Sequence, residues 1–172
     1  MKNPDEPLFD SEFEIEPKHV TDDPNLPEKI RRIVNDQLYG ILCTQGHEQP
    51  YGSLIAFAFD ESLNCFVFST PIATRKYRLL SECNRVALVV DTRSSGTSEM
   101  SKIEGLTVTG TAHRIDEDND FESCADMLVK RHPQLKSFIH APSSALFRVD
   151  VFRYFHVARF QEVQEWIPPK KQ

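Results

Sequence analysis

The sequence predicts a mainly β fold, in which six antiparallel strands form a barrel with a few peripheral helices. Six separate segments show the alternation or the short apolar run that is typical of strands, and only short helical patterns interrupt them. With 172 residues, 40% of them hydrophobic, the chain is long enough for one domain with a sizeable core. The predicted strands are Gly40–Thr44, Tyr51–Phe59, Asn64–Ser69, Arg85–Asp91, Gly105–Ile115 and Ala145–Val157.

Two of these strands show how the faces are expected to divide. In Gly105–Ile115, apolar residues alternate with threonines and His113, so one face is buried and the other is polar, as in antiparallel sheets. Ala145–Val157 is the longest strand, and an unbroken alternation gives it an apolar and a polar face. We expect the polar face to carry Arg148, Asp150, Tyr154 and His156, opposite Phe147, Val149, Val151, Phe155 and Val157.

Three segments have the periodicity of helices. Glu28–Gln37 follows Pro27, which suits a first helical turn. Thr74–Glu82 is a short helix between two strands. Glu117–Arg131 is the longest, with an acidic first turn and a basic last turn that match the helix dipole, and Pro133 ends it.

Residues 1–27 are predicted to form a flexible acidic arm, and residues 28–172 a single domain. The arm contains eight acidic and two basic residues, and it has too few apolar residues to offset the entropy of ordering. The rest of the chain contains 18 acidic and 18 basic residues, so the net charge of −6 comes from the arm. A neutral domain has no general attraction for a phosphate backbone, and we expect no nucleic-acid partner.

The sequence also predicts no membrane partner and no metal site. No segment approaches the roughly 20 apolar residues of a membrane span. Cys43, Cys65, Cys83 and Cys124 lie far apart without the paired spacing of zinc or redox motifs. We therefore expect a cytoplasmic protein whose cysteines are structural thiols.

The segment from Phe68 to Arg78 concentrates hydroxyl groups and cations where a strand turns into a helix. A phosphate monoester is bound by backbone N–H groups at a helix N-terminus, by short hydroxyl donors and by a cation. Arg75 supplies a planar fork of donors and Lys76 a point charge. Taken alone, the segment is also compatible with a solvated surface helix. The hydroxyl donors are Ser69, Thr70 and Thr74.

Two further segments have residues that suit a flat ring. Arg93, Ser94 and Ser95 follow the most hydrophobic strand and could reach the oxygens of a ring such as an isoalloxazine, although Ser-Ser-Gly is also ordinary turn chemistry. Gly52 and Ser53 leave room for a ring to approach the backbone, although small residues at a strand start need no ligand.

In this order, the segments TPIATRKYRLL, NRVALVVDTRS and LTVTGTA resemble the pyridoxamine 5′-phosphate oxidase-like FMN-binding split-barrel family, in particular its short general members. The resembling stretch runs from about Tyr39 to Trp166. The resemblance implies a six-stranded antiparallel split β-barrel with Greek-key connections. It also implies a homodimer with FMN at the subunit interface, where both subunits line each site.

The resemblance assigns roles to particular residues. Arg93, Ser94 and Ser95 match the stretch near the ring or the ribityl chain, and Trp166 resembles an aromatic residue that closes the site, with packing on the barrel as its alternative role. The phosphate-binding set corresponds to Ser69, Thr70, Arg75 and Lys76. The strand beside the ring corresponds to Tyr51, Gly52, Ser53 and Leu54.

The function that this resemblance implies is an FMN-dependent oxidoreductase acting on a small-molecule redox substrate. Hydride transfer to a flavin requires no protein acid or base, so no catalytic residue is assigned. The true oxidases carry a basic motif after the tryptophan that holds the substrate phosphate. Here Trp166 is followed by IPPKKQ, so vitamin B6 oxidation is not expected.

Two alternative functions stay open at this point. Some relatives handle haem, and His113, His140 and His156 are possible axial ligands, although a single histidine is more often structural. The other alternative is a non-catalytic flavin-binding module for stress response or sensing.

Overall fold

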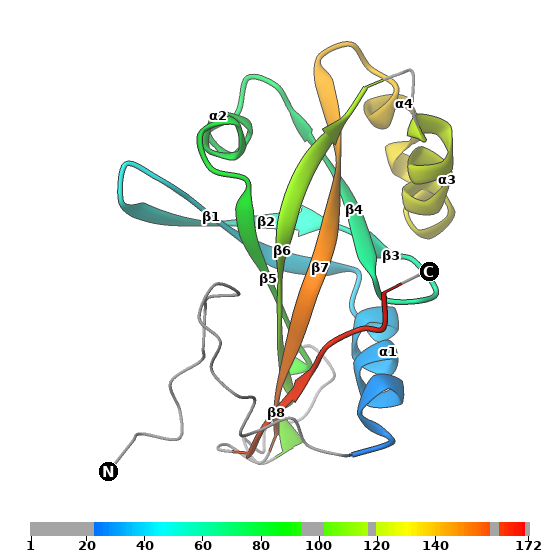
Figure 1. Ribbon diagram of the computed structural model, residues 1–172. Helices are drawn as coiled ribbons and strands as arrows, with labels where there is room; N and C mark the ends of the chain where they lie inside the picture. The colour runs from blue at the N-terminus through cyan, green and yellow to red at the C-terminus, as the bar shows by residue number, and fades with distance from the viewer. Residues whose placement is uncertain (1–22, 94–101, 117–119, 159–161, 171–172) are drawn as a thin grey trace.

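The computed structural model describes residues 23–93, 102–116, 120–158 and 162–170 as one curled antiparallel sheet with helices around it (Figure 1). The strand order is β2-β1-β5-β6-β7-β4-β3, and β8 pairs with β7. This arrangement confirms the predicted mainly β, split-barrel fold. The strands are β1 (Tyr39–Gly46), β2 (Gln49–Ala56), β3 (Ala58–Phe59), β4 (Cys65–Pro71), β5 (Arg85–Asp91), β6 (Gly105–Ile115), β7 (Ser144–Ala158) and β8 (Glu162–Trp166).

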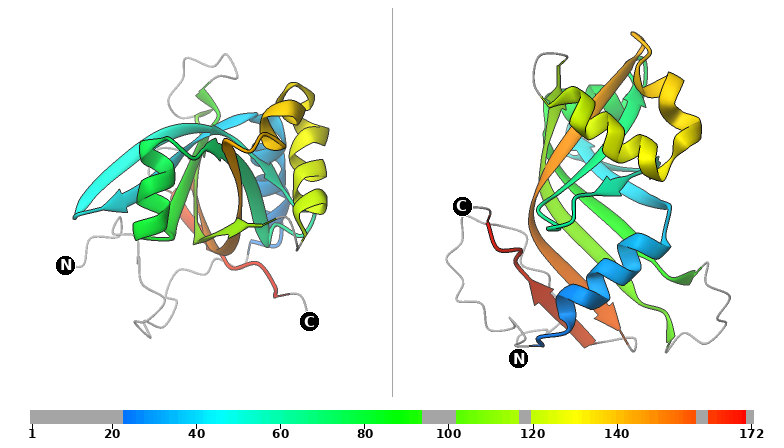
Figure 2. Two further views of the ribbon diagram at one scale, coloured as in Figure 1. Left: turned by 90° about the horizontal axis from the view of Figure 1, so that it is seen from above. Right: turned by 90° about the vertical axis from the view of Figure 1, so that its right-hand side faces the viewer.

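The two ends of the sheet are joined through Phe57. β2 pairs with β1 at one end of the strand order, and β3 pairs with β4 at the other end. Because Phe57 alone separates Ala56 in β2 from Ala58 in β3, the sheet curls until its ends meet (Figure 2). The single strand predicted over Tyr51–Phe59 is therefore two strands, since its halves have different partners.

The main hydrophobic core fills the curled sheet, and α1 (Leu26–Asp36) packs against it. Leu26, Ile30 and Ile33 of this helix are fully buried, and each such side chain stabilises the fold by about 1.5–3 kcal/mol. The helix begins two residues before the predicted start at Glu28. Residues 1–22, most of the predicted arm, lie outside the described residues.

A second, smaller cluster lies between the sheet and α3 (Phe121–Arg131). Val67 and Leu146 come from the sheet, and Ala125 and Leu128 come from the helix; all four are buried. The helical spacing of four apolar residues predicts this helix, and all four belong to this cluster: Phe121, Cys124, Ala125 and Leu128. All four cysteines are free thiols.

A β-bulge in β7 reverses the predicted alternation of this strand. Between the partners of Thr109 and Gly110, β7 contains one extra residue, Phe152. Beyond the bulge the opposite set of residues points inward, so Tyr154 and His156 are 0% and 2% exposed. Placing them on a polar face was wrong, because that prediction assumed an unbroken period of two.

The remaining helices agree with the sequence only in part. The predicted helix Thr74–Glu82 is α2 (Arg75–Glu82), and Thr74 is its N-cap residue. α3 begins at Phe121, after Asp120 in a left-handed conformation with φ 53°. The predicted start at Glu117 lies outside the described residues. β8 and α4 (Lys136–Ile139) were missed because elements this short show no period. No helix in the described parts is long and apolar enough to cross a membrane.

Arg131, the last residue of α3, caps the C-terminal end of α1. Its Nη2 donates hydrogen bonds to the carbonyl oxygens of Val34, Asn35 (3.1 Å) and Gln37 (2.7 Å), in the region where a helix leaves carbonyls without partners. Its guanidinium carbon lies 5.2 Å from the centroid of the Phe57 ring. One side chain thus connects α1, α3 and the junction of the sheet.

We expect Arg131→Met to lower the free energy of unfolding by about 2–3 kcal/mol, because it leaves half-buried carbonyls without a charged donor. Urea denaturation followed by circular dichroism measures this change. Lys130→Met, at the exposed neighbouring position, is the matched control and should change stability by less than about 0.5 kcal/mol. Equal effects of the two substitutions would contradict the capping role.

His132 completes this junction, between α3 and the 3-10 turn Pro133–Leu135. It is 1% exposed, and its Nε2 lies 3.1 Å from the carbonyl oxygen of Phe57. Because a carbonyl only accepts, Nε2 carries the proton and donates it. Burial lowers the pKa of His132 below its ordinary value of 6.5, although the bond to Phe57 acts in the opposite direction.

This lowered pKa predicts a loss of stability on acidification. Well above pH 6.5 the side chain is neutral in both the folded and the unfolded state. As the pH falls below 6.5, the unfolded chain binds a proton that the folded chain resists, so the free energy of unfolding decreases. His132→Gln should reduce the slope of the free energy of unfolding against pH by the equivalent of up to about one proton. If the free energy of unfolding changed with pH in the same way in His132→Gln and in the wild type, His132 would not be the source of this pH dependence.

Candidate functional site

The turn between β4 and α2 is held by hydroxyl groups. Thr74 is the N-cap of α2: its Oγ1 accepts a hydrogen bond from the backbone N–H of Tyr77 at 3.3 Å and donates one to the carbonyl of Pro71 at 2.8 Å. Thr70, which is 1% exposed, has its Oγ1 3.1 Å from that of Thr74. Because the Thr74 proton is used on Pro71, Thr70 is the donor of this pair.

These bonds qualify the predicted role of the hydroxyl groups. Ser69 likewise donates to the carbonyl oxygen of Ala145 in β7, at 3.1 Å. All three hydroxyl protons therefore bond to protein atoms, and an anion at this turn would first meet backbone N–H groups and cations. Ser69, Thr70 or Thr74 reaches it only by exchanging an internal bond.

The cations of α2 lie beside the start of that helix. The N–H groups of Arg75 and Lys76 are in the first turn, where a helix offers them no partner, and no acidic residue occupies this turn. Arg75 is exposed, and its guanidinium lies 5.2 Å from the Tyr51 ring centroid. Lys76 Nζ donates to the carbonyl of Leu54 at 3.3 Å, and burial lowers the pKa of this amine. Neither cation forms an ion pair with a described acidic residue.

The predicted residues of β2 lie close to α2, but they point to two different faces of the strand. Ser53 is half-buried, and its Oγ lies 3.5 Å from the carbonyl of Leu42 in β1. Gly52 and Leu54 point to the opposite face of the strand, where Leu54 is 65% exposed. Tyr51, on the same face as Ser53, contacts Arg75. The structure thus collects the predicted residues of β2, β4 and α2 in one region.

Arg93 does not lie in that region. β5 starts next to the end of α2 and runs away from it, so Asp91, at its far end, lies roughly 20 Å from its start (Figure 1). The Arg93 guanidinium forms two 2.8 Å bonds with the Asp91 carboxylate, and these bonds lower the pKa of Asp91. Ser94 and Ser95 lie outside the described residues.

Trp166 also lies apart from α2 within the chain. It is in β8, and its ring centroid is 5.4 Å from that of Tyr154, its partner in β7. Four strands separate β8 from β2 along the sheet. Trp166 packs against the main core, which is the alternative role considered for it.

Sequence reasoning missed the contact that anchors α2 to β6. Arg114 Nη1 donates to the Tyr77 hydroxyl at 2.8 Å, and the Tyr77 ring meets Phe147 edge to face at 6.1 Å. The only sequence signal was an aromatic residue inside the basic segment of α2. Two hollows flank this part of β6, and Arg114 lines both.

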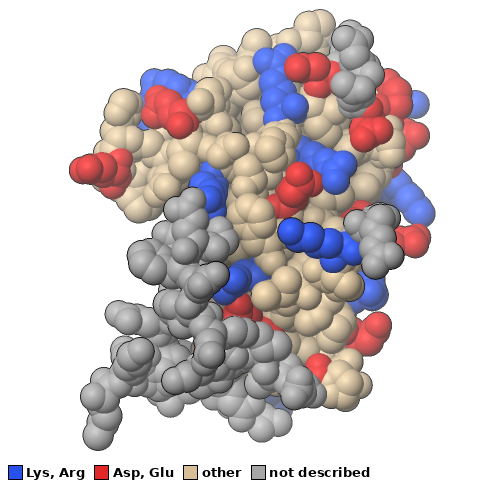
Figure 3. Space-filling view, in the orientation of Figure 1, with Lys and Arg blue, Asp and Glu red and all other residues tan. Residues whose placement is uncertain are grey.

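The charged side chains and the histidines of the described residues are the groups that would form a nucleic-acid surface, a metal site or a haem ligand. Figure 3 shows acidic and basic side chains interspersed over one face, without a broad basic patch. The described residues contain no group of three or more potential metal ligands. His156 is buried beside Glu104, with 3.1 Å between Nε2 and Oε2, whereas the more accessible His113 and His140 lie 3.6 Å from Asp150 and Glu122, respectively.

Comparisons with solved structures support the fold. The haem-binding protein of Mycobacterium smegmatis superposes with a TM-score of 0.72 at 18% identity, covering 81% of this chain and 57% of that protein. General stress protein 26 of Bacillus anthracis superposes with a TM-score of 0.62 at 15% identity, covering 83% of this chain and 98% of that protein. An FAD-binding protein of Mesorhizobium loti superposes with a TM-score of 0.62 at 14% identity, covering 76% of this chain and 90% of that protein. This chain therefore spans little more than half the length of the mycobacterial protein.

Sequence comparison identifies the family. A search of curated proteins found no significant match. The sequence profile of pyridoxamine 5′-phosphate oxidase, in contrast, matches residues 26–158, from the start of α1 to the end of β7. The chain therefore belongs to the pyridoxamine 5′-phosphate oxidase family.

Proposed function

We propose that this protein binds FMN and uses it as an oxidoreductase on a small-molecule substrate. The observation that supports this most directly is the start of α2, where unpartnered N–H groups, Arg75 and Lys76 converge without a neutralising acid among the described residues. This donor set suits a phosphate monoester. Thr70 and Thr74 line the same turn, and either hydroxyl would exchange an internal hydrogen bond to reach a phosphate.

The flat ring would lie along β2. Gly52 has no side chain, and a Cβ at this position would approach only Ile41 of β1, at 3.2 Å, so a ring can come close to the backbone. Leu54 projects from the same face and is exposed. Bound FMN would supply the redox chemistry, while the protein residues hold and orient it and exclude water. The FAD-binding relative from Mesorhizobium loti is consistent with a flavin ligand in this fold.

The site is proposed to be shared by two subunits. Tyr39, Ile41 and Leu54 are exposed apolar side chains on neighbouring β1 and β2, and Ile41 and Leu54 are direct cross-strand partners. Covering this strip with a second copy would bury apolar surface beside the proposed ring site. A partner subunit would also bring Arg93 and Trp166 to a site from which they are distant within one chain.

Flavin binding is tested by absorbance and fluorescence titration of the purified protein with FMN. We expect a shifted flavin band, and we expect Arg75→Ala, Lys76→Ala to weaken FMN binding by roughly tenfold or more, because both phosphate-facing cations are lost. Lys130→Ala, Lys136→Ala removes the same charge from α3 and α4 and should leave affinity within about twofold. Absence of binding at micromolar FMN, or equal loss in both double variants, would overturn the phosphate site.

The dimer is tested by sedimentation velocity. Ile41→Lys, Leu54→Lys should convert a dimer to a monomer and weaken FMN binding at the same time, because it places charges in the apolar strip. Phe152→Lys, at another exposed apolar position, should leave the dimer intact. A wild-type protein that sediments as a monomer would contradict the shared site.

Haem handling is the second candidate, favoured by the likeness to the mycobacterial haem-binding protein. His113 is the histidine on the sheet that is accessible to a ligand, since its side chain is 54% exposed and a carboxylate lies beside it. Titration with haemin separates the two functions: a Soret band lost in His113→Ala supports haem. A flavin complex without reduction by NADH or NADPH would instead indicate the non-catalytic flavin module.

A further inference from the structure

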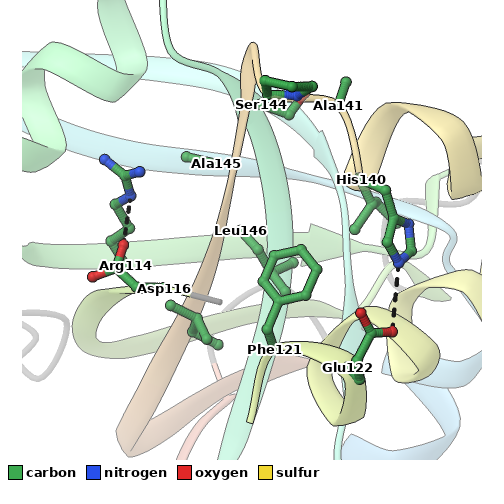
Figure 4. A pocket seen from close by; sticks show the side chains of 12 residues that line it. Arg114, Asp116, Phe121, Glu122, His140, Ala141, Ser144, Ala145 and Leu146 are labelled. Carbon is green, nitrogen blue, oxygen red and sulfur yellow. Dashed lines mark ion pairs between the residues drawn. The ribbon is translucent and has the colours of Figure 1, made fainter. Parts of the chain in front are cut away.

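A hollow outside the proposed flavin site lies between the end of β6, the start of α3, and the segment from α4 to β7. Its floor is apolar: Ile139, Ala145 and Leu146 are 2%, 3% and 1% exposed. Figure 4 shows the Phe121 ring between Leu146 and the His140–Glu122 pair. The hollow therefore combines an apolar floor and an aromatic ring with titratable groups at one side.

The surroundings of His140 determine the tautomer of its neutral ring. Its Nδ1 lies 2.8 Å from the carbonyl oxygen of Lys136, and because a carbonyl only accepts, Nδ1 carries a proton. In the neutral ring Nε2 is then a lone-pair acceptor. The carboxylate oxygen Oε2 of Glu122 lies 3.6 Å from this Nε2. Two acceptors thus face each other across a gap that suits a shared N–H donor.

The charges around the hollow favour a cationic donor. Glu122 and Asp116 are each 77% exposed, so their carboxylates can move to meet a ligand. Arg114 is held by Asp116 (3.2 Å) and by the Tyr77 hydroxyl (2.8 Å), and Figure 4 shows its guanidinium turned away from His140. The Phe121 ring, edge to face with His140 at 5.7 Å, offers a π-surface to a cation.

From this arrangement we propose that the hollow binds a small primary amine with an apolar or aromatic body. The ammonium group donates hydrogen bonds to His140 Nε2 and to Glu122, and the body of the ligand covers Phe121, Ala145 and Leu146. This site is separate from the proposed flavin site and does not depend on it.

Binding of the amine competes with protonation of His140. The bond to the Lys136 carbonyl, assisted by Glu122, raises the pKa of His140 above its ordinary value of 6.5. Below that raised pKa the imidazolium fills the gap with its own N–H and repels an ammonium ion. As the pH rises through it, Nε2 becomes an acceptor, so amine affinity increases. Among the described residues, the other charged groups near the hollow are Arg114 on β6, Asp116 directly after this strand, Asp120 at the N-cap of α3 and Lys136 on α4.

The test is a titration of the full chain with 2-phenylethylamine, followed by the NMR shifts of the His140 ring. We expect saturable binding that is about tenfold tighter near pH 8.5 than near pH 5.5, and a lower apparent pKa of His140 when the amine is bound. Glu122→Gln should weaken binding about five- to tenfold. Asp126→Asn removes the same charge from an exposed position of α3 outside the hollow, and should change affinity by less than about twofold.

Three results would overturn the proposal. The first is no saturable shift at millimolar amine. The second is equal binding of the neutral analogue 2-phenylethanol, which would show that the hollow recognises only the ring. The third is equal weakening by Glu122→Gln and Asp126→Asn, which would indicate nonspecific attraction. Circular dichroism of both variants checks that they fold.

Discussion

The junction at Phe57 is the constraint on which the rest of the structure depends. At this residue the chain leaves its pairing with β1 and begins its pairing with β4, so the two ends of the sheet meet there. His132 donates to the Phe57 carbonyl, and Arg131 lies against the Phe57 ring while it caps α1. A break in β-pairing leaves backbone groups that need new partners, and His132, directly after α3, supplies one for the Phe57 carbonyl. The closed sheet, α1 and α3 are therefore connected at this junction.

This closure also determines where ligands can approach. The interior is filled by aromatic and aliphatic side chains, such as the stacked Phe68 and Phe147 rings 5.3 Å apart, so it is a packed core. Ligand chemistry is consequently confined to the outside and the rim of the barrel. The start of α2 gathers cations at one part of the rim, and the hollow beside α3 and α4 places His140 and Glu122 at another. The start of α2 suits an anionic ligand, whereas the hollow beside α3 and α4 suits a cationic one.

The proposed flavin site contains both rigid and exposed parts. Thr74 and Thr70 fix the backbone of the turn through internal bonds, whereas the Arg75 side chain is exposed, with the Tyr51 ring beside it. A preformed helix start with exposed cations suits a phosphate, because the donors need little rearrangement. The proposal of a second subunit is based on geometry, since β5 carries Arg93 away from α2 and β8 holds Trp166 against Tyr154.

The sequence by itself determined the strand content, the principal helices and the phosphate-type segment. Each depends on local order: the alternation in β6, the stripe of α3, and the run from Thr70 to Lys76 are all read within a few residues. The family motifs, which lie in consecutive segments, were accessible for the same reason. The exposed position of Leu54 beside Ile41, in contrast, required the register of β1 and β2.

Only the tertiary structure decided which segments meet and which faces are buried. The bulge at Phe152 turned Tyr154 and His156 inward, because a register depends on the neighbouring strand and leaves no mark in the periodicity. The split at Phe57 likewise results from two different partners. The His140–Glu122 pair joins residues 18 positions apart in sequence: Glu122 lies in α3, and His140 is the C-cap residue of α4. Such contacts depend on the long-range packing of the sheet, which no local pattern specifies.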